Sequence, residues 1–384
     1  MKKTLLTLLF SVNVYSINAQ TLPTPDHVII IMMENKGYSQ IIGSSNAPYI
    51  NSLISDPHCA LFSDSHGITH PSQPNYLQLF SGSNQGVTTD NQDFSTPYST
   101  CNLAYSLIAA GHTFKGFSEG LPAVGSLTYA AGTFVRRHCP WASWIGTGTN
   151  QINANLHQPY TSFPAVASYS TLPTVSFIIP DNSHNMHNPV LTASIGITNG
   201  DTWLSNNIPN LITWVKAHNS LLIIQYDEDE SLTGAATVNT IPTMFIGSMV
   251  LGGTYNNTYT HYGLLKTVED MYSLPACGSS SGLSPITNCW ASVTTSIEEL
   301  NKKKFQLYPI PTNNQIQVEL QEEVTENSHI IVTDMYGRLL FMEELTAKDK
   351  HLTIDTKNFK SGVYFLSING NSIHSSQRFV IERD

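Results

Sequence analysis

Residues 69–76, THPSQPNY, hold a single serine, Ser72, between two prolines. Pro71 and Pro74 restrict the backbone on either side of it, and the segment NYLQLFSG that follows predicts the first turns of a helix. Helix capping alone would explain a serine at this place. The amino end of a helix also attracts phosphate through its free N–H groups, and a serine beside a bound cation loses its proton readily and attacks phosphorus. The stretch therefore predicts either a helix cap or a nucleophile.

Carboxylates and imidazoles follow three apolar runs of the chain. Glu34 and Asn35 follow HVIIIMM, the group Asp181, His184 and His187 follows TVSFIIP, and Asp227, Glu228 and Asp229 follow SLLIIQY. Because parallel strands end at one edge of a sheet, we expect these side chains to gather there. Zinc and harder divalent cations both accept carboxylate and imidazole ligands. Three such strand ends predict a site for one or two divalent ions, whose identity the sequence does not give.

The elements that must position these residues indicate an α/β fold. The runs HVIIIMM, TVSFIIP, SLLIIQY and TMFIG have the continuous hydrophobicity of strands that are buried on both faces. Between them lie helical patterns, APYINSLISD, NLAYSLIAAG, WLSNNIPNLITWVKAH and HYGLLKTVEDMYSL. Strands that alternate with helices predict a mostly parallel sheet flanked by helices. Asp201, just before TWL, is expected to cap a helix.

Composition and the amino terminus limit the possible functions. The chain has 384 residues, of which 41% are hydrophobic and 12% charged, with a net charge of −10. Without a basic stripe to neutralise phosphates, it is not expected to bind nucleic acid. Residues 1–19 predict a secretory signal peptide, with a buried first helix as the alternative. No other segment approaches ~18 apolar residues, so we expect no membrane span.

Five cysteines occur in a chain that is expected to be exported. Export permits disulfides, and the odd number leaves at least one thiol unpaired within the chain. Cys277 and Cys289 bracket the loop GSSSGLSP and are the pair that we expect to be linked. None of the five has the spacing of a structural zinc site.

Composition changes near residue 300. After it come short alternating segments, IQVEL, HIIVTDMYGRLLFMEEL, LTIDT and GVYFLSI, with a turn expected at Tyr336–Gly337. These segments predict strands. We therefore expect an α/β domain at residues 20–300, followed by a small all-β sandwich domain at residues 301–384.

The α/β domain resembles the phosphoesterase family that contains bacterial acid phosphatases and phospholipases C. The resemblance rests on EN at 34–35, THPSQPNYLQLFSG at 69–82, AGHTFKGFSEGLP at 110–122, VRRHCPW at 135–141, PDNSHNMH at 180–187, GDTWL at 200–204, YDEDE at 226–230 and THYGLLKTVEDMYSLP at 260–275. It runs in order over about residues 26–275. This family is part of the alkaline phosphatase-like superfamily, and the resemblance implies metal-dependent hydrolysis through a phosphorylated serine or threonine.

The resemblance also implies roles for single residues. Ser72 falls at the nucleophile position, and Asn75 at that of a donor to a phosphate oxygen. The residues at metal-ligand positions are Glu34, Asn35, Asp227, Glu228, His187 and His261. Two residues before His187 the family has an aspartate, whereas this chain has Asn185. An aspartate appears earlier, and we expect Asp181 to be the ligand in its place.

Two further histidines are candidates for catalysis. His70 and His138 could contact the phosphate or protonate the leaving group, a role that requires a group titrating near neutrality. Ordinary hydrogen bonding is the alternative for both. Glu119 lies in a resembling segment, but a salt-bridged loop would explain it equally well.

The C-terminal module has a resemblance of its own. YPIPTNNQIQVEL, VTDMYGRLLF, FKSGVYFLSI and the final RFVIERD are similar to the C-terminal sorting domain of the type IX secretion system of Bacteroidetes. The resemblance implies passage through the periplasm, contact with the outer-membrane secretion machinery, and release or display at the cell surface. The alternative is a carbohydrate-binding or adhesive sandwich attached to an enzyme.

The sequence thus favours an exported, metal-dependent phosphomonoesterase. A phospholipase C that cleaves a lipid phosphodiester is the second enzyme reading, and a surface protein that only binds is the alternative outside the enzymes. A sulfatase would need an arginine after the nucleophile's proline, and Asn75 stands there instead.

Overall fold

The computed structural model describes most of the chain. The described residues are 22–91, 96–188, 192–230, 239–291, 305–321, 328–335, 338–346, 349–369 and 374–383. Contacts separate a first compact unit, residues 1–292, from a second, residues 293–384. The expected signal peptide at 1–19 and the expected boundary at residue 300 lie outside the described residues.

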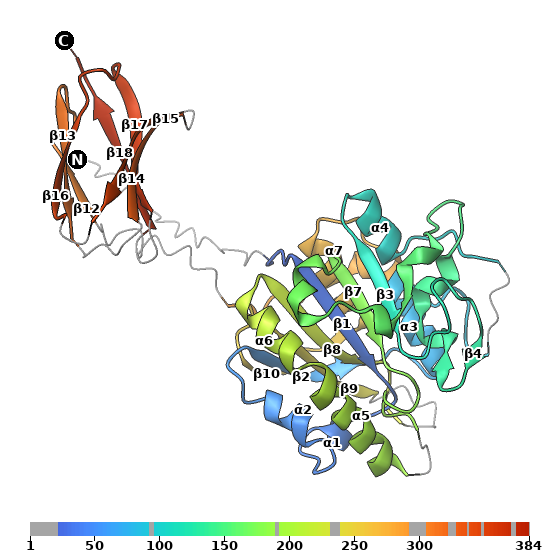
Figure 1. Cartoon of the computed structure of the whole chain (residues 1–384). Coiled ribbons are helices and arrows are strands. Elements are labelled where there is room, and N and C mark those ends of the chain that lie inside the picture. The colour runs from blue at the N-terminus through green and yellow to red at the C-terminus, as the bar shows by residue number, and fades with distance from the viewer. Residues whose placement is uncertain are drawn as a thin grey trace, which may run out of the picture. The chain divides into compact units, whose positions relative to one another are not determined.

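A nine-stranded sheet forms the centre of the first unit (Figure 1). Its order is β10 (Gly253–Tyr255), β2 (Cys59–His66), β9 (Thr240–Ile246), β8 (Ser220–Tyr226), β1 (His27–Met33), β7 (Val175–Ile179), β3 (Phe114–Ser118) and β6 (His157–Pro159), and β11 (Tyr259–Thr260) pairs with β2. Strand β9 is antiparallel to both of its neighbours, while the other pairings are parallel. The mostly parallel sheet is confirmed.

Helices cover both faces of this sheet (Figure 1). They are α1 (Tyr38–Ile41), α2 (Pro48–Leu53), α3 (Ser72–Ser81), α4 (Leu103–Ala109), α5 (Ala193–Asn207), α6 (Pro209–Ala217) and α7 (His261–Met271). Short 3-10 helices are η1 (Arg136–His138), η2 (Pro140–Trp144), η3 (Ala154–Leu156), η4 (Tyr160–Ser162), η5 (Val166–Thr171) and η6 (Gly278–Gly282), and a small ribbon pairs β4 (Ala130–Ala131) with β5 (Phe134–Val135).

The alternation of side chains along β1 explains why its sequence is apolar throughout. Val28, Ile30 and Met32 belong to the apolar cluster that includes α3, α4 and α7, whereas Ile29 and Ile31 belong to the cluster that includes α2, α5 and α6. Each fully buried aliphatic side chain contributes about 1.5–3 kcal/mol relative to exposure. The sheet is therefore anchored on both faces, as the continuous apolar runs predict.

The structure departs from the expected elements at several points. The pattern WLSNNIPNLITWVKAH forms parts of two helices, because Pro209 stands at the first position of α6 and ends the preceding helix. Asp201 caps a different helix from the one expected: its carboxylate accepts bonds from the backbone N–H groups of Tyr49 (2.9 Å) and Ile50 (2.8 Å) in α2. Strands β2 and β3 were not expected, since β2 ends in polar residues and β3 has only five.

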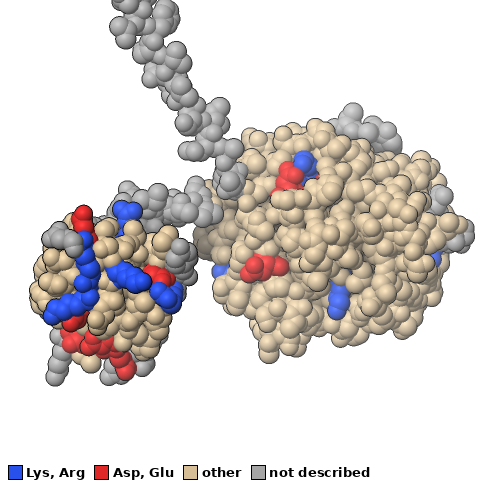
Figure 2. Space-filling model, turned by 90° about the horizontal axis from the view of Figure 1, so that it is seen from above, with Lys and Arg blue, Asp and Glu red and all other residues tan. Residues whose placement is uncertain are grey.

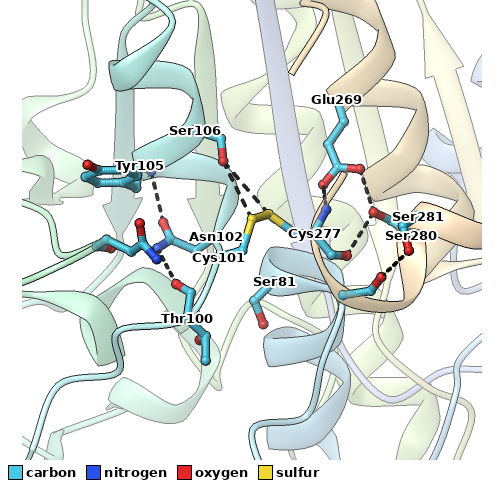
Figure 3. Close-up of a disulfide and its surroundings, with 12 residues drawn as sticks. Ser81, Thr100, Cys101, Asn102, Tyr105, Ser106, Glu269, Cys277, Ser280 and Ser281 are labelled. Atoms are coloured by element: carbon cyan, nitrogen blue, oxygen red, sulfur yellow. Dashed lines mark hydrogen bonds between the residues drawn. A yellow bond between two sulfur atoms is a disulfide. The ribbon is translucent and has the colours of Figure 1, made fainter. Parts of the chain in front are cut away.

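The expected Cys277–Cys289 disulfide is wrong, because Cys277 pairs with Cys101 across 176 residues (Figure 3). Cys101 stands just before α4, whose N-cap is Asn102. Cys289 is a free, fully buried thiol in the core, where it packs as a small apolar side chain. Proximity in sequence was therefore a poor guide to this pairing.

The segment after α7 is fixed by Glu269 as well as by this disulfide (Figure 3). The Glu269 carboxylate accepts bonds from the Cys277 N–H (2.8 Å) and the Ser280 hydroxyl (2.6 Å). The same segment touches the end of α3, where a Cβ on Gly82 would lie 1.8 Å from the Cys277 carbonyl oxygen. The far ends of α3 and α7 are thus held together, and both helices begin at the edge where the parallel strands end.

The second unit is a β-sandwich. One sheet has the order β12 (Phe305–Tyr308), β13 (Gln315–Leu320), β16 (His351–Asp355), and the other has β15 (Leu339–Leu345), β14 (Ser328–Asp334), β17 (Gly362–Asn369), β18 (His374–Ile381). Side chains of both sheets, such as Ile316 and Leu366, share one core. The all-β prediction is confirmed, and the turn expected at 336–337 lies outside the described residues.

Charged side chains are distributed unevenly over the two units. On the face seen in Figure 2, the first unit shows few Lys, Arg, Asp or Glu side chains, while the second unit is densely charged. This first-unit surface agrees with the low charged content of the whole chain, 12%. Within the described residues, no helix combines the length and the hydrophobicity needed to cross a bilayer.

We expect Glu269 to make folding stability depend on pH. Burial raises its pKa from 4.5 to about 7, with the Ser280 and Cys277 hydrogen bonds opposing the shift. A raised folded-state pKa means that the contribution is complete below pH 4.5 and is lost as pH rises through about 7. Glu269→Gln should therefore flatten the fall in melting temperature between pH 5 and pH 8. Asp64→Asn should not, because hydrogen bonds from Thr258 and His66 lower the pKa of Asp64, which titrates below this range. An unchanged slope in Glu269→Gln would contradict this assignment.

Candidate active site

The candidate active site lies at the edge where the parallel strands end. Glu34 directly follows β1, Asp227 directly follows β8, and the segment from Asp181 follows β7. Strands β8, β1 and β7 are neighbours in the sheet, which brings their ends side by side (Figure 1). This is the edge at which α/β folds bind ligands.

Ser72 is the first residue of α3, and the N-cap position belongs to Pro71. The serine side chain does not cap the helix, because its hydroxyl donates instead to Glu228 Oε1 at 3.0 Å. The carboxylate of Asp90 accepts a bond from the Gln73 N–H (2.9 Å) at this end of the helix. Ser72 is 2% exposed, and its hydroxyl lies against a carboxylate and not against the backbone of the helix.

Asn75 links the loop before α3 to the same carboxylate. Its side-chain oxygen accepts bonds from the backbone N–H groups of Ile68 (2.9 Å) and Thr69 (3.1 Å). Its amide nitrogen donates to the Thr69 carbonyl (2.7 Å) and to Glu228 Oε2 (3.2 Å). Asn75 therefore positions the loop that carries His70, and its NH₂ group points towards Glu228.

His70 lies between two carboxylates of the segment that follows β8. Its Nδ1 is 2.9 Å from Glu228 Oε2, and its Nε2 is 3.4 Å from Asp229 Oδ1. Ser72, Glu228, His70 and Asp229 thus form one continuous chain of polar contacts. About a fifth of the His70 side chain is exposed, so this end of the chain is accessible from outside.

His138 and Asn185 converge on Glu34, which is fully buried. His138 Nε2 lies 2.6 Å from Glu34 Oε1, and the Asn185 amide donates to Oε2 at 2.6 Å. Tyr76 stacks on the His138 ring at 5.1 Å and fixes its plane. Burial on its own would raise the Glu34 pKa, but the charge and hydrogen bond of His138, with smaller contributions from His187 and Arg137, lower it to about 2.

Asp227 and Glu228 are buried next to Glu34. Asp227 Oδ1 accepts bonds from the N–H groups of Asn35 (2.9 Å) and Glu228 (2.7 Å), whereas Oδ2 is buried with no hydrogen-bond partner among the described residues. Burial raises the pKa of Asp227 well above its usual range, and the Glu34 charge adds to this. Burial also raises the Glu228 pKa to about 10, with the Asp227 charge acting in the same direction.

Three other residues expected to be ligands lie around this group: His261 and Asn35 contact Asp227, and His187 contacts Asn188. His261 Nε2 is 2.6 Å from the Asp227 carbonyl oxygen, and its Nδ1 is 3.2 Å from the Gln225 amide. Asn35 contacts the site through its backbone N–H, in a left-handed conformation at φ 58°. His187 Nδ1 lies 3.0 Å from the Asn188 side-chain oxygen.

Asp181 belongs to a second cluster rather than to the group around Glu34. Ligand atoms of Glu119, Asp181 and His184 all lie within 4.8 Å of one another, an arrangement that could hold a metal ion. His184 Nδ1 is 2.9 Å from Glu119 Oε2, and the Thr133 hydroxyl donates to Asp181 Oδ2 at 2.5 Å. Asn185, two residues before His187, is the one that hydrogen-bonds Glu34, and the metal role expected for Asp181 stays a prediction.

Some site residues escaped the sequence analysis. Lys36 is almost fully buried and forms an ion pair with Glu230 at 3.1 Å. Tyr76, which holds His138, lies within the segment THPSQPNY but was not singled out. Glu119 had been noted, yet its partnership with Asp181 depends on β3 and β7 being adjacent, a pairing that only the three-dimensional structure reveals.

Comparison with known proteins identifies the family. Residues 44–275 match the sequence profile of the phosphoesterase family. The chain belongs to this family. Residues 306–382 match the profile of the secretion system C-terminal sorting domain. The family membership agrees with the expected function: this phosphoesterase is a hydrolase that acts on phosphoric ester bonds.

Curated relatives of this phosphoesterase are phosphatases by name. A phosphatidylinositol-3-phosphatase of Mycobacterium tuberculosis is 40% identical over 272 residues, which cover 71% of this chain and 85% of the relative. An acid phosphatase of Aspergillus fumigatus is 24% identical over 73% of this chain, and the match spans 63% of that protein. A solved alkaline phosphatase superfamily protein from Vibrio parahaemolyticus aligns with 95% of this chain and 83% of its own, at 10% identity and a TM-score of 0.48.

The buried carboxylates of this phosphoesterase fit a divalent cation. Glu34, Asp227 and Glu228 are at most 3% exposed, and burying several carboxylates together is costly without a compensating positive charge. The unpartnered Asp227 Oδ2 is an available ligand atom. An oxygen-rich donor set suits hard cations such as Mg²⁺, Ca²⁺ or Mn²⁺.

Proposed function

We propose that this phosphoesterase hydrolyses phosphate monoesters through a phosphoserine formed on Ser72. The observation that carries the proposal is the buried Ser72 hydroxyl, which donates to Glu228 at 3.0 Å from the first turn of α3. In the first step, the Ser72 oxygen attacks phosphorus, the serine proton passes to Glu228, and the ester oxygen leaves. In the second step, water gives a proton to His70 and attacks the phosphoserine, the bond between phosphorus and the Ser72 oxygen breaks, inorganic phosphate is released, and the Ser72 oxygen regains the proton held by Glu228.

Other site residues have supporting roles in this proposal. Asn75, whose amide faces Glu228, donates to a phosphate oxygen. His138 holds Glu34 in its ionised form, and the amino end of α3 favours the charge of the phosphate. His70, which is in contact with Glu228 and Asp229, supplies a proton to the departing alcohol oxygen.

One or two divalent cations complete the proposed site. The residues that would hold a cation are Glu34, Asp227 and Glu228, with Asn35, His187 and His261 around them, and Asp181 would take part in a second position with Glu119 and His184. A bound cation would lower the pKa of the serine hydroxyl and neutralise charge on the phosphate.

The names of the relatives support a monoester substrate, and the second unit supports export. Phosphatase names favour a monoester over the phosphodiester of a phospholipase C. The sorting domain at 306–382 supports export to the cell surface or the medium by secretion machinery in the outer membrane. The expected signal peptide at 1–19 would bring the chain to the periplasm first.

Ser72→Ala should lower kcat on p-nitrophenyl phosphate by at least about a thousandfold with the fold intact, because the nucleophile is lost. Acid quenching of the wild type during turnover of ³²P-labelled substrate should leave label on the peptide that contains residue 72. Ser81→Ala, at the other end of α3, is the matched control and should retain both activity and labelling. Near-normal turnover by Ser72→Ala would reject the phosphoserine mechanism.

Removing divalent cations with a chelator should abolish turnover of the monoester, and adding back single metals should restore it. Asp227→Asn should raise the metal concentration needed for half-maximal activity, because it removes a charged ligand from a buried site. The surface variant Asp64→Asn serves as control. Full activity in protein shown to be metal-free by elemental analysis would disprove the cation requirement. A parallel assay with a phosphodiester tests the phospholipase C alternative.

His70→Gln should lower kcat for alkyl phosphates by about 10²–10⁴-fold, since an alkoxide leaves poorly without a proton. The effect on p-nitrophenyl phosphate should be much smaller, because p-nitrophenolate leaves without protonation. His66→Gln, a histidine of similar exposure that contacts Asp64, provides the control. Equal losses on both substrates would show that His70 is not the acid.

A further inference from the structure

A cavity of about 670 Å³ opens at the same edge of the sheet as the active site. It is lined by Gly37, Tyr38, Ser39, Gln40, Asp229, Glu230 and Thr240. These residues come from the segment after β1, the segment after β8 and the start of the antiparallel strand β9. The volume is within the range of about 300–1,000 Å³ that is typical of small-molecule sites.

This cavity is joined to the catalytic group through Asp229. Asp229 directly follows Glu228, the residue that accepts the Ser72 hydrogen bond. His70 connects the two carboxylates, at 2.9 Å from Glu228 and 3.4 Å from Asp229. The wall of the cavity is therefore next to the group that would protonate a departing alcohol.

The charges on the cavity wall already have partners. Glu230 Oε1 forms an ion pair with Lys36 at 3.1 Å, and its Oε2 accepts a bond from the Gln40 amide at 2.7 Å. Asp229 faces His70. A cationic ligand would compete with Lys36 for Glu230, whereas a neutral ligand that donates hydrogen bonds can use the remaining lone pairs of both carboxylates.

The cavity also offers hydrogen-bond donors. The Tyr38 ring packs against the apolar cluster that includes α2, α5 and α6, and the residue lines the cavity, to which its hydroxyl can donate. Ser39 is exposed and adds a second hydroxyl. Carboxylate acceptors and hydroxyl donors on one wall match the alternating donors and acceptors of a polyhydroxylated alcohol.

We propose that this cavity binds the alcohol portion of the substrate, and that this alcohol is a polyol with several free hydroxyl groups. The proposal rests on the phosphomonoesterase function proposed above and names its substrate class. The phosphate lies at Ser72, the alcohol oxygen lies within reach of His70, and the remaining hydroxyls bind Tyr38, Ser39 and Asp229. Selectivity arises from these hydrogen bonds and not from charge.

The test compares the full-length wild type with Tyr38→Phe and Ser39→Ala on two substrates. myo-Inositol 1-phosphate carries the proposed polyol, and p-nitrophenyl phosphate carries an aromatic alcohol with no hydroxyl to bind there. Each variant should lower kcat/KM for the polyol ester relative to the aromatic ester by about three- to tenfold, the effect of one lost neutral hydrogen bond. Tyr105→Phe is the matched control, because Tyr105 is partly exposed and lines a different cavity.

The possible outcomes separate the two proposals. An unchanged ratio in Tyr38→Phe and Ser39→Ala, with p-nitrophenyl phosphate still hydrolysed, overturns the polyol site and leaves the phosphomonoesterase intact. Preference of the wild type for O-phosphocholine over the polyol ester also overturns it, since the cavity would then select a cation. No hydrolysis of any monoester by the metal-loaded wild type rejects the proposed function, and the polyol site with it.

Discussion

The burial of three carboxylates at one sheet edge is the constraint on which the rest of the active site depends. Glu34 and Asp227 are fully buried and Glu228 is 3% exposed, so the repulsion between them is little screened by water. His138 lies 2.6 Å from Glu34, and backbone N–H groups bind one oxygen of Asp227. No described residue donates a hydrogen bond to Asp227 Oδ2. Such an arrangement lowers stability unless a positive charge compensates it.

The scaffold withstands this cost because both faces of the sheet are packed. β1 and β8 supply apolar side chains to two separate clusters, and the buried carboxylates directly follow these strands. The helices that carry Ser72 and His261 are joined at their far ends by contacts of the Cys277 segment with Gly82. The ends of α3 and α7 that carry Ser72 and His261 are therefore held in place by packing at a distance from these residues.

The sequence predicted the structure best where the local pattern of side chains is enough to show whether a segment is buried. Continuous apolar runs predict strands that are covered on both faces, as for β1, β7, β8 and the antiparallel β9, and residues such as Glu34 and Asp227 then fall at strand ends. Partnerships across the sheet could not be predicted in the same way. The position of Asn185 against Glu34, the cluster of Asp181 with Glu119, and the disulfide from Cys101 all depend on which distant segments become neighbours.

The two prolines around Ser72 have a physical explanation in this geometry. A serine at the N-cap position would cap the helix, and its hydroxyl would then point towards the backbone. Here Pro71 occupies the N-cap, Ser72 is the first helical residue, and its hydroxyl donates to Glu228. Pro74 removes a donor that the first turn does not need. The stiff segment thus prevents the competing interaction that would make this serine structural.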